Sequence, residues 1–158
     1  MKYRSILFIL ICFYFISPAV SAPYIEIIEV GSFKLHVSPD FKNGIATEKY
    51  DPPELRENSN YLKADIGKTF GIYYAVRGHY PNEQIRLRLI IIYPHPGIFD
   101  RKTNQYSLIS ESNINSTADT AQYMLFSIDE ENHKIKGECI FQIWQNNIKL
   151  SEKSFFLF

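Results

Sequence analysis

Three arginines and two histidines lie close together in the middle of the chain, in the segment AVRGHYPNEQIRLRLIIIYPHPG. Arg86 and Arg88 are two residues apart, so on an extended chain their guanidinium groups lie on the same face and can hold a carboxylate or another anion between them. If the protein binds a small ligand, we expect Arg77, Arg86, Arg88 and His95 to contact it. The alternative is a solvated face whose arginines pair with nearby acidic residues.

The residue types that support catalysis or metal binding do not form a recognisable motif. The histidines are His36, His79, His95 and His133, and no two of them have metal-ligand spacing within one element. There is no G-x-S-x-G nucleophile turn and no glycine run of the kind that binds phosphate. We therefore expect no catalytic residues, no metal and no cofactor, and a function in binding. A small ligand-binding or hydrolytic protein that uses the arginines and loop histidines is the alternative.

The elements that carry these residues show a two-residue alternation typical of half-buried strands. In residues 70–76 the even positions are apolar, and Gly78 is expected to end that strand. In residues 85–93 the odd positions are apolar, whereas Arg86 and Arg88 lie on the other face, followed there by two isoleucines. The PHPG segment that follows should leave the sheet as a turn, because proline lacks a backbone donor.

The rest of the chain predicts further strands joined by turns. Strands are expected at residues 25–37, with a bulge or bend at Gly31, and at 105–110, 121–128, 139–144 and 148–158. Asn146 and Asn147 predict a tight turn with positive φ. The segment DPPELRE (51–57) is compatible with one helical turn, and SNINSTADT (112–120) with a polar loop. The whole predicts an all-β, antiparallel immunoglobulin-like β-sandwich of about seven to eight strands.

The amino terminus has the pattern of a secretory signal peptide. Lys2 and Arg4 precede a short apolar run, and small residues follow. We expect residues 1–22 to be the signal peptide, with cleavage after Ser21 or Ala22, and residues 23–158 to form a single domain. The protein is then periplasmic or secreted, without stable membrane insertion. The mature part has no polybasic run, which argues against nucleic acid as a partner.

Cys139 and Trp144 lie in the strand predicted at 139–144. Cys139 is the only cysteine after the predicted leader, and no activating neighbour is evident, so we expect a small buried apolar side chain. Trp144 is either packed between the sheets or exposed as a contact residue. We expect an envelope or extracellular protein to bind through loops or an edge strand, for which residues 24–37 and the terminal hairpin are candidates.

Three motifs carry a resemblance to a known bacterial family. They are FGIYYAVRG, LIIIYPHPG and the closing segment GECIFQIWQNNIKLSEKSFFLF, with Gly137, Lys149, Leu150 and Phe155. In these motifs residues 24–158 resemble the family of domain of unknown function 3859. The resemblance implies an exported all-β domain and brings no activity and no site residues. One position departs from the pattern, since Cys139 stands where the family is expected to have an aromatic residue.

Overall fold

The computed structural model describes residues 22–35, 52–101 and 103–158. Most of the predicted signal peptide, His36 and most of the connection after the first strand therefore lie outside the described residues. Within the described part no helix is long and apolar enough to cross a membrane. The one helical segment there that the structure assigns is a short 3₁₀ turn, η2 (Glu131–His133).

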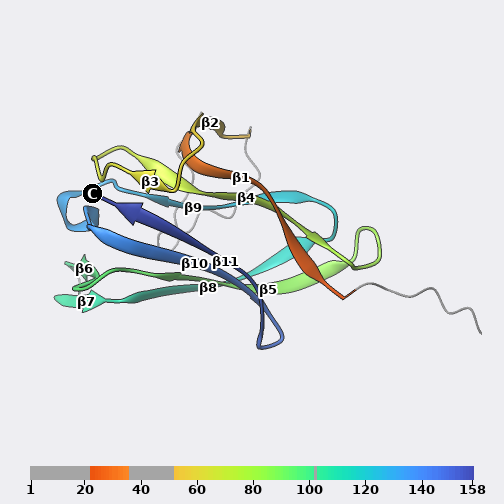
Figure 1. Ribbon diagram of the computed structural model, residues 1–158. Helices are drawn as coiled ribbons and strands as arrows, with labels where there is room; N and C mark the ends of the chain where they lie inside the picture. Colours follow the sequence, from red (N-terminus) through yellow and green to blue (C-terminus); the bar gives the residue numbers. More distant parts are fainter. Residues whose placement is uncertain (1–21, 36–51, 102) are drawn as a thin grey trace, which may run out of the picture.

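The described residues form two stacked β-sheets and a small hairpin (Figure 1). The four-stranded sheet has the order β2-β1-β4-β9, with β1 at Tyr24–Lys34, β2 at Glu54–Glu57, β4 at Thr69–Arg77 and β9 at Ala121–Ser127. The five-stranded sheet has the order β3-β11-β10-β5-β8, with β3 at Tyr61–Leu62, β5 at Gln84–Ile92, β8 at Ile109–Thr117, β10 at Gly137–Gln145 and β11 at Ile148–Leu157. The hairpin pairs β6 (Ile98–Asp100) with β7 (Gln105–Ser107).

The predicted sandwich is confirmed, and seven of its strands are seven residues or longer. Neighbouring strands run antiparallel except β3, which runs parallel to the end of β11. The turn between β10 and β11 has positive φ at Asn146 (47°) and Asn147 (65°), as the sequence predicts. Asparagine tolerates this conformation, which matches the twist of the two strands that it joins.

The core lies between the sheets and follows the predicted alternation. The even positions of β4 and the odd positions of β5 are buried, while Arg86 and Arg88 lie on the opposite face of β5. Phe70 is at the centre of an aromatic cluster, with ring centroids 5.2 Å from Phe155, 5.6 Å from Phe126 and 5.7 Å from Phe141. These rings come from both sheets, so their burial, worth about 1.5–3 kcal/mol each, holds the layers together.

The first strand is bent as expected, but not at the expected residue. Its register against β4 shifts between Ile27 and Glu29, so the bulge lies at that point. Gly31 serves the pairing with β2 instead, since a Cβ there would lie 1.8 Å from the carbonyl oxygen of Glu57. Only glycine permits so close an approach of the two backbones.

Two local predictions are wrong. The expected helical turn in residues 51–57 is the strand β2, because residues 54–57 pair with the end of β1. The expected polar loop at 112–120 is mostly the second half of β8, which pairs with β5 without interruption from Ile109 to Thr117. In both places the pairing partner, and not the local composition, determines the conformation.

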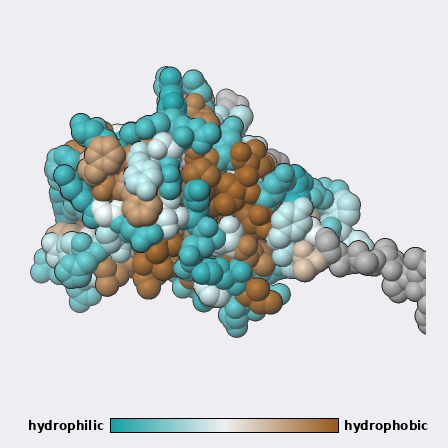
Figure 2. Space-filling view, in the orientation of Figure 1, coloured by the Kyte–Doolittle hydropathy of each residue, from teal (hydrophilic) through white to brown (hydrophobic). Residues whose placement is uncertain are grey.

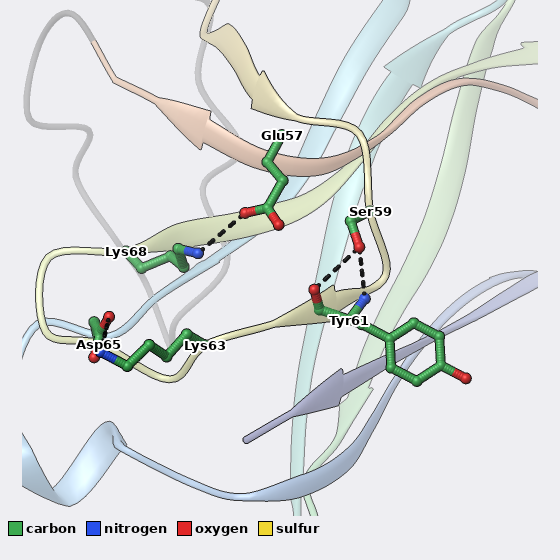
Figure 3. A network of polar contacts seen from close by, with 6 residues as sticks. All are labelled: Glu57, Ser59, Tyr61, Lys63, Asp65 and Lys68. Carbon is green, nitrogen blue, oxygen red and sulfur yellow. Dashed lines mark hydrogen bonds and ion pairs between the residues drawn. The ribbon is translucent and has the colours of Figure 1, made fainter.

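The connection from β2 to β3 fixes one end of the five-stranded sheet (Figure 3). The Ser59 hydroxyl accepts a hydrogen bond from the Tyr61 backbone N–H and donates one to the Tyr61 carbonyl, both at 3.0 Å. Lys68 forms an ion pair with Glu57 at 3.2 Å. The Tyr61 ring points away from these groups and stacks on Phe156 at 5.0 Å. The loop thereby covers the last residues of β11.

Candidate functional site

The outer face of the five-stranded sheet is the surface on which the predicted arginine pair lies. This outer face consists of the side chains of β8, β5, β10 and β11 that point away from the core. Pairing between the strands places its residues in rows: Asn113, Arg88 and Trp144 form one row, and Glu111, Ile90 and Gln142 the next. A row brings side chains that are far apart in sequence to about 5 Å from one another.

Trp144 lies half-buried on the outer face and not between the sheets. The guanidinium carbon of Arg88 lies 5.3 Å from the centroid of its ring, a distance at which a cation is attracted to the indole face. The indole Nε1 donates a hydrogen bond to the Gln142 side-chain oxygen at 2.9 Å. Arg88 also faces Glu111 at 3.9 Å, which is a loose ion pair. Trp144 is therefore held in one orientation while part of its ring stays open to solvent.

A polar network continues from Trp144 toward the edge of the sheet. Gln142 Nε2 donates to a carboxylate oxygen of Glu152 at 2.8 Å, and Lys149 Nζ binds the same oxygen at 2.6 Å. Hydrogen bonds from Lys149 and then Gln142 lower the pKa of Glu152 from its ordinary value. The network thus keeps Glu152 ionised and positions the amide that receives the indole N–H.

An apolar row lies beside this polar network on the outer face. Ile109, Ile92 and Ile140 are paired across β8, β5 and β10, and Ile109 is 53% exposed. Ile90 lies in the neighbouring row, next to Ile92 on the same face of β5, and is half-buried. We call these four residues together, Ile90, Ile92, Ile109 and Ile140, the isoleucine row. An apolar group beside a tryptophan and an arginine has the composition of protein contact surfaces.

The other predicted site residues are not brought together with Arg86 and Arg88. Arg77 lies at the end of β4 in the other sheet, where it binds Glu26 at 2.6 Å and Asp119 at 2.9 Å. Hydrogen bonds from Asp119 and then Glu26 raise the pKa of Arg77. His95 lies in the turn after β5, and the nine residues of β5 span roughly 30 Å. Whether any of the four residues binds a ligand stays a prediction.

Histidines at the two ends of the sandwich are separate, as the sequence predicts. His79 lies 3.4 Å from Glu83 and 3.3 Å from the Gln145 side chain, near the start of β5. His95 lines a shallow hollow of about 420 Å³ at the far end of that strand. In residues 22–35, 52–101 and 103–158, no group of three or more His, Cys, Asp or Glu side chains is placed to hold a metal ion.

An open cleft of about 630 Å³ lies next to the hairpin β6–β7. Its walls include the rings of Tyr93, Phe99 and Phe126, with Arg101 and Glu130 3.5 Å apart. Burial raises the pKa of the Tyr93 hydroxyl, so this group stays protonated at neutral pH. None of the arginines predicted from sequence lines the cleft.

Cys139 is completely buried and belongs to the core, as expected. It is a free thiol that pairs in register with Phe155 across β10 and β11. Burial raises the pKa of the thiol, because the apolar surroundings disfavour a thiolate. A protonated, inaccessible thiol is not a nucleophile.

The edges proposed for strand addition differ in how accessible they are. β1 is interrupted by two register shifts, and β11 carries Lys149 and Lys153 and is paired with β3 at its end. Bulges and lysines are features that protect an edge from pairing. Apolar surface lies in the middle of the view in Figure 2, where β1 and β11 lie side by side in Figure 1. Ile25, Val30 and Leu150 of these strands are only partly buried against the core.

Sequence reasoning missed the isoleucine row and the network around Trp144. Alternation places Trp144 on the same side of β10 as Gln142, so its outward direction is readable from the sequence. The contact of Arg88 with Trp144 depends on pairing between two residues that are 56 positions apart in sequence (144 − 88). No local pattern reports that pairing.

Comparisons with known proteins support the fold. No family model matches the sequence, and no curated protein matches it. The chain is similar in structure to an immunoglobulin-like protein from Pseudomonas aeruginosa, with a TM-score of 0.64 and 21% sequence identity over 89% of this chain and 99% of that one. An alkylpurine DNA glycosylase from Pseudomonas fluorescens bound to DNA containing an abasic site analog gives a TM-score of 0.37 and 12% identity over 62% of this chain and 27% of that one. The first likeness shows an immunoglobulin-like fold; the second is too distant to carry an argument.

Proposed function

We propose that the protein is an exported, non-catalytic binding module of the bacterial cell envelope and that it binds another protein on its outer face. The observation that carries this proposal is the contact of Arg88 with Trp144 beside the isoleucine row. Tryptophan and arginine dominate the energetics of protein contacts, and a ring fixed in advance loses little entropy on binding. The signal-peptide pattern of residues 1–22 supports export. The resemblance to the family of domain of unknown function 3859, which implies an exported all-β domain, supports export as well.

The composition of the outer face indicates the chemistry of the partner. The isoleucine row suits aliphatic or aromatic side chains. Arg88 retains donors that its loose pair with Glu111 does not occupy, so a partner carboxylate can bind there. We therefore expect a protein surface with apolar side chains next to an acidic residue.

A pulldown with matched variants tests the proposal. The tagged protein is incubated with envelope extract beside Trp144→Ala and Ile92→Asp, with Tyr24→Ala as the control. Tyr24 is an aromatic residue on the other sheet with 50% exposure. A stoichiometric protein that binds the wild type and Tyr24→Ala but neither outer-face variant supports the proposal. A protein that binds all four equally contradicts it.

Fluorescence gives a second readout, because Trp144 is the only tryptophan in the chain. Binding of the captured partner to the outer face should protect Trp144 from quenching by acrylamide. Unchanged quenching in a saturated complex would place the partner on another surface.

A small-ligand carrier is the second candidate, and the cleft of about 630 Å³ favours it. Its volume is in the range of small-molecule sites. Native mass spectrometry of the purified protein separates the two: a co-purifying small molecule that is lost in Phe99→Ala favours the carrier.

A further inference from the structure

β8 is a long edge strand that lacks the usual protection against pairing. It contains neither proline nor lysine, its pairing with β5 has no bulge, and Glu111 is its only charged residue. Ile109, Glu111, Asn113 and Asn115 are all exposed. β9, the edge of the other sheet, has no exposed residue. Natural edge strands of this length are usually blunted by charge, bulges or proline.

The direction of the backbone groups of β8 follows from hydrogen bonds at its two ends. The Leu108 carbonyl accepts a hydrogen bond from the Tyr93 N–H, and the Ala118 N–H donates one to the Glu83 carbonyl. The backbone N–H and C=O groups of the even-numbered residues of β8 therefore point toward β5. Because these directions alternate in an antiparallel strand, the N–H and C=O of residues 111, 113 and 115 point away from β5. Within the described residues no strand pairs with that side.

The outward-pointing N–H and C=O groups of β8 can pair with the same groups of a second copy that is related by a two-fold axis. Asn113 is the middle residue of β8, so an antiparallel pairing of two copies centred there overlaps the whole strand. Asn113 then pairs with the partner's Asn113, and Asn115 pairs with the partner's Glu111. All are residues whose free backbone groups point outward, so each N–H meets a carbonyl.

Charge favours the same register. Arg86 is opposite Asn115 on β5, and no ion pair of Arg86 is found in the described part of the chain. In the dimer the partner's Glu111 lies on the other side of Asn115, on the same face. The two backbones are then about 10 Å apart, which an arginine and a glutamate side chain span together. Centring the axis on Glu111 would instead place two glutamates opposite each other.

We propose that two copies of this protein associate through antiparallel pairing of β8 with β8, centred on Asn113, with Arg86 of each copy paired to the partner's Glu111. The five-stranded sheets become one continuous sheet across the dimer. Both outer faces then lie on the same side of the assembly. The contact uses β8, so it does not require that the isoleucine row or Trp144 bind anything.

Sedimentation velocity at rising protein concentration tests the dimer. We expect a monomer–dimer equilibrium, and we expect slower hydrogen exchange at the amides of Glu111, Asn113 and Asn115 as the protein is concentrated. Glu111→Arg and Arg86→Glu should each raise the Kd about tenfold or more, because each places like charges together. The double variant should restore the wild-type Kd. Glu138→Arg is the control, since Glu138 is an exposed glutamate on β10, away from β8.

Asn113→Pro gives an independent test. The Asn113 N–H points away from β5, so proline removes no hydrogen bond between β5 and β8 but blocks the centre of the dimer. A folded, monomeric variant supports the proposal. A protein that stays monomeric at every concentration overturns it, as does a dimer that is unaffected by Glu111→Arg and Asn113→Pro.

Discussion

Arg88 and Trp144 form the central contact of the outer face, with the guanidinium carbon 5.3 Å from the centroid of the indole ring. The two residues come from neighbouring strands, β5 and β10, and are directly paired in register. Such a pair needs both strands in place, so it reports on the correct assembly of the sheet as well as on its surface.

The energetic coupling of this pair is measurable. Trp144→Ala should cost about 1–2 kcal/mol of unfolding free energy, because the ring is half-buried, against about 3–5 kcal/mol for a buried tryptophan. A double-mutant cycle with Arg88→Ala, followed by urea denaturation, should give a coupling of about 0.5–1 kcal/mol. A coupling near zero would show that the contact between Arg88 and Trp144 does not contribute to the unfolding free energy.

Arg77 and Arg86 should differ in their effect on stability. Arg77 bridges Glu26 and Asp119, so Arg77→Ala should lower the unfolding free energy, and salt should reduce this difference. Arg86→Ala should change it by less than about 0.5 kcal/mol in the monomer. Thermal denaturation in low and high salt distinguishes the two, and equal effects would contradict the bridging role of Arg77.

Gly71 should tolerate no side chain. A Cβ at this position would lie 2.0 Å from the carbonyl oxygen of Met124 on the neighbouring strand β9. Gly71→Ala should therefore cost at least about 3 kcal/mol. Gly67→Ala is the control: its φ is +84°, but a Cβ would have no neighbour within 4 Å, so we expect about 1 kcal/mol. If urea denaturation gave the same loss of unfolding free energy for both variants, β4 and β9 would have to separate easily at Gly71.

The buried thiol of Cys139 predicts both a reactivity and a pH dependence. Iodoacetamide should label Cys139 only in the denatured protein. Burial raises the pKa of the thiol in the folded state, so its contribution is complete below the unfolded pKa of about 8.5 and decreases as the pH rises above it. Burial next to Tyr73 raises the pKa of Tyr123 to about 12, which acts in the same direction above about pH 10. Rapid labelling of the native protein would contradict this account.

The pH dependence has a matched control. Cys139→Ala removes the thiol, so the loss of stability between about pH 8.5 and pH 10 should be smaller in that variant. The variant also loses packing against the core, which lowers stability equally at all pH values. The slope against pH, and not the absolute stability, is the quantity to compare.

The sequence predicts those parts of the fold that depend on local pattern. Alternation identifies the buried faces of β4 and β5, and the two asparagines identify the turn between β10 and β11. Most of β8 is not predicted as a strand, because most of its inward-facing residues are serines and give no apolar alternation. Its conformation comes from hydrogen bonding to β5, an interaction of the folded state that local composition does not encode.

The candidate site is predictable to the same extent. That Arg86 and Arg88 share a face follows from their spacing. Two contacts depend instead on which strands are neighbours: Asp119 binds Arg77, and Trp144 lies under Arg88. A single sequence without related sequences contains no record of those pairings.

The pairing of β3 with the end of β11 bears on how the protein reaches its folded state. Residues 61–62 are joined to residues 156–157, and β10, at the centre of the five-stranded sheet, comes late in the chain. During synthesis β5 can therefore find only β8, and the apolar sides of both sheets stay uncovered until about residue 157 has emerged. Pairing over such sequence distances is slow. The domain should consequently complete its folding only after β11 has been synthesised.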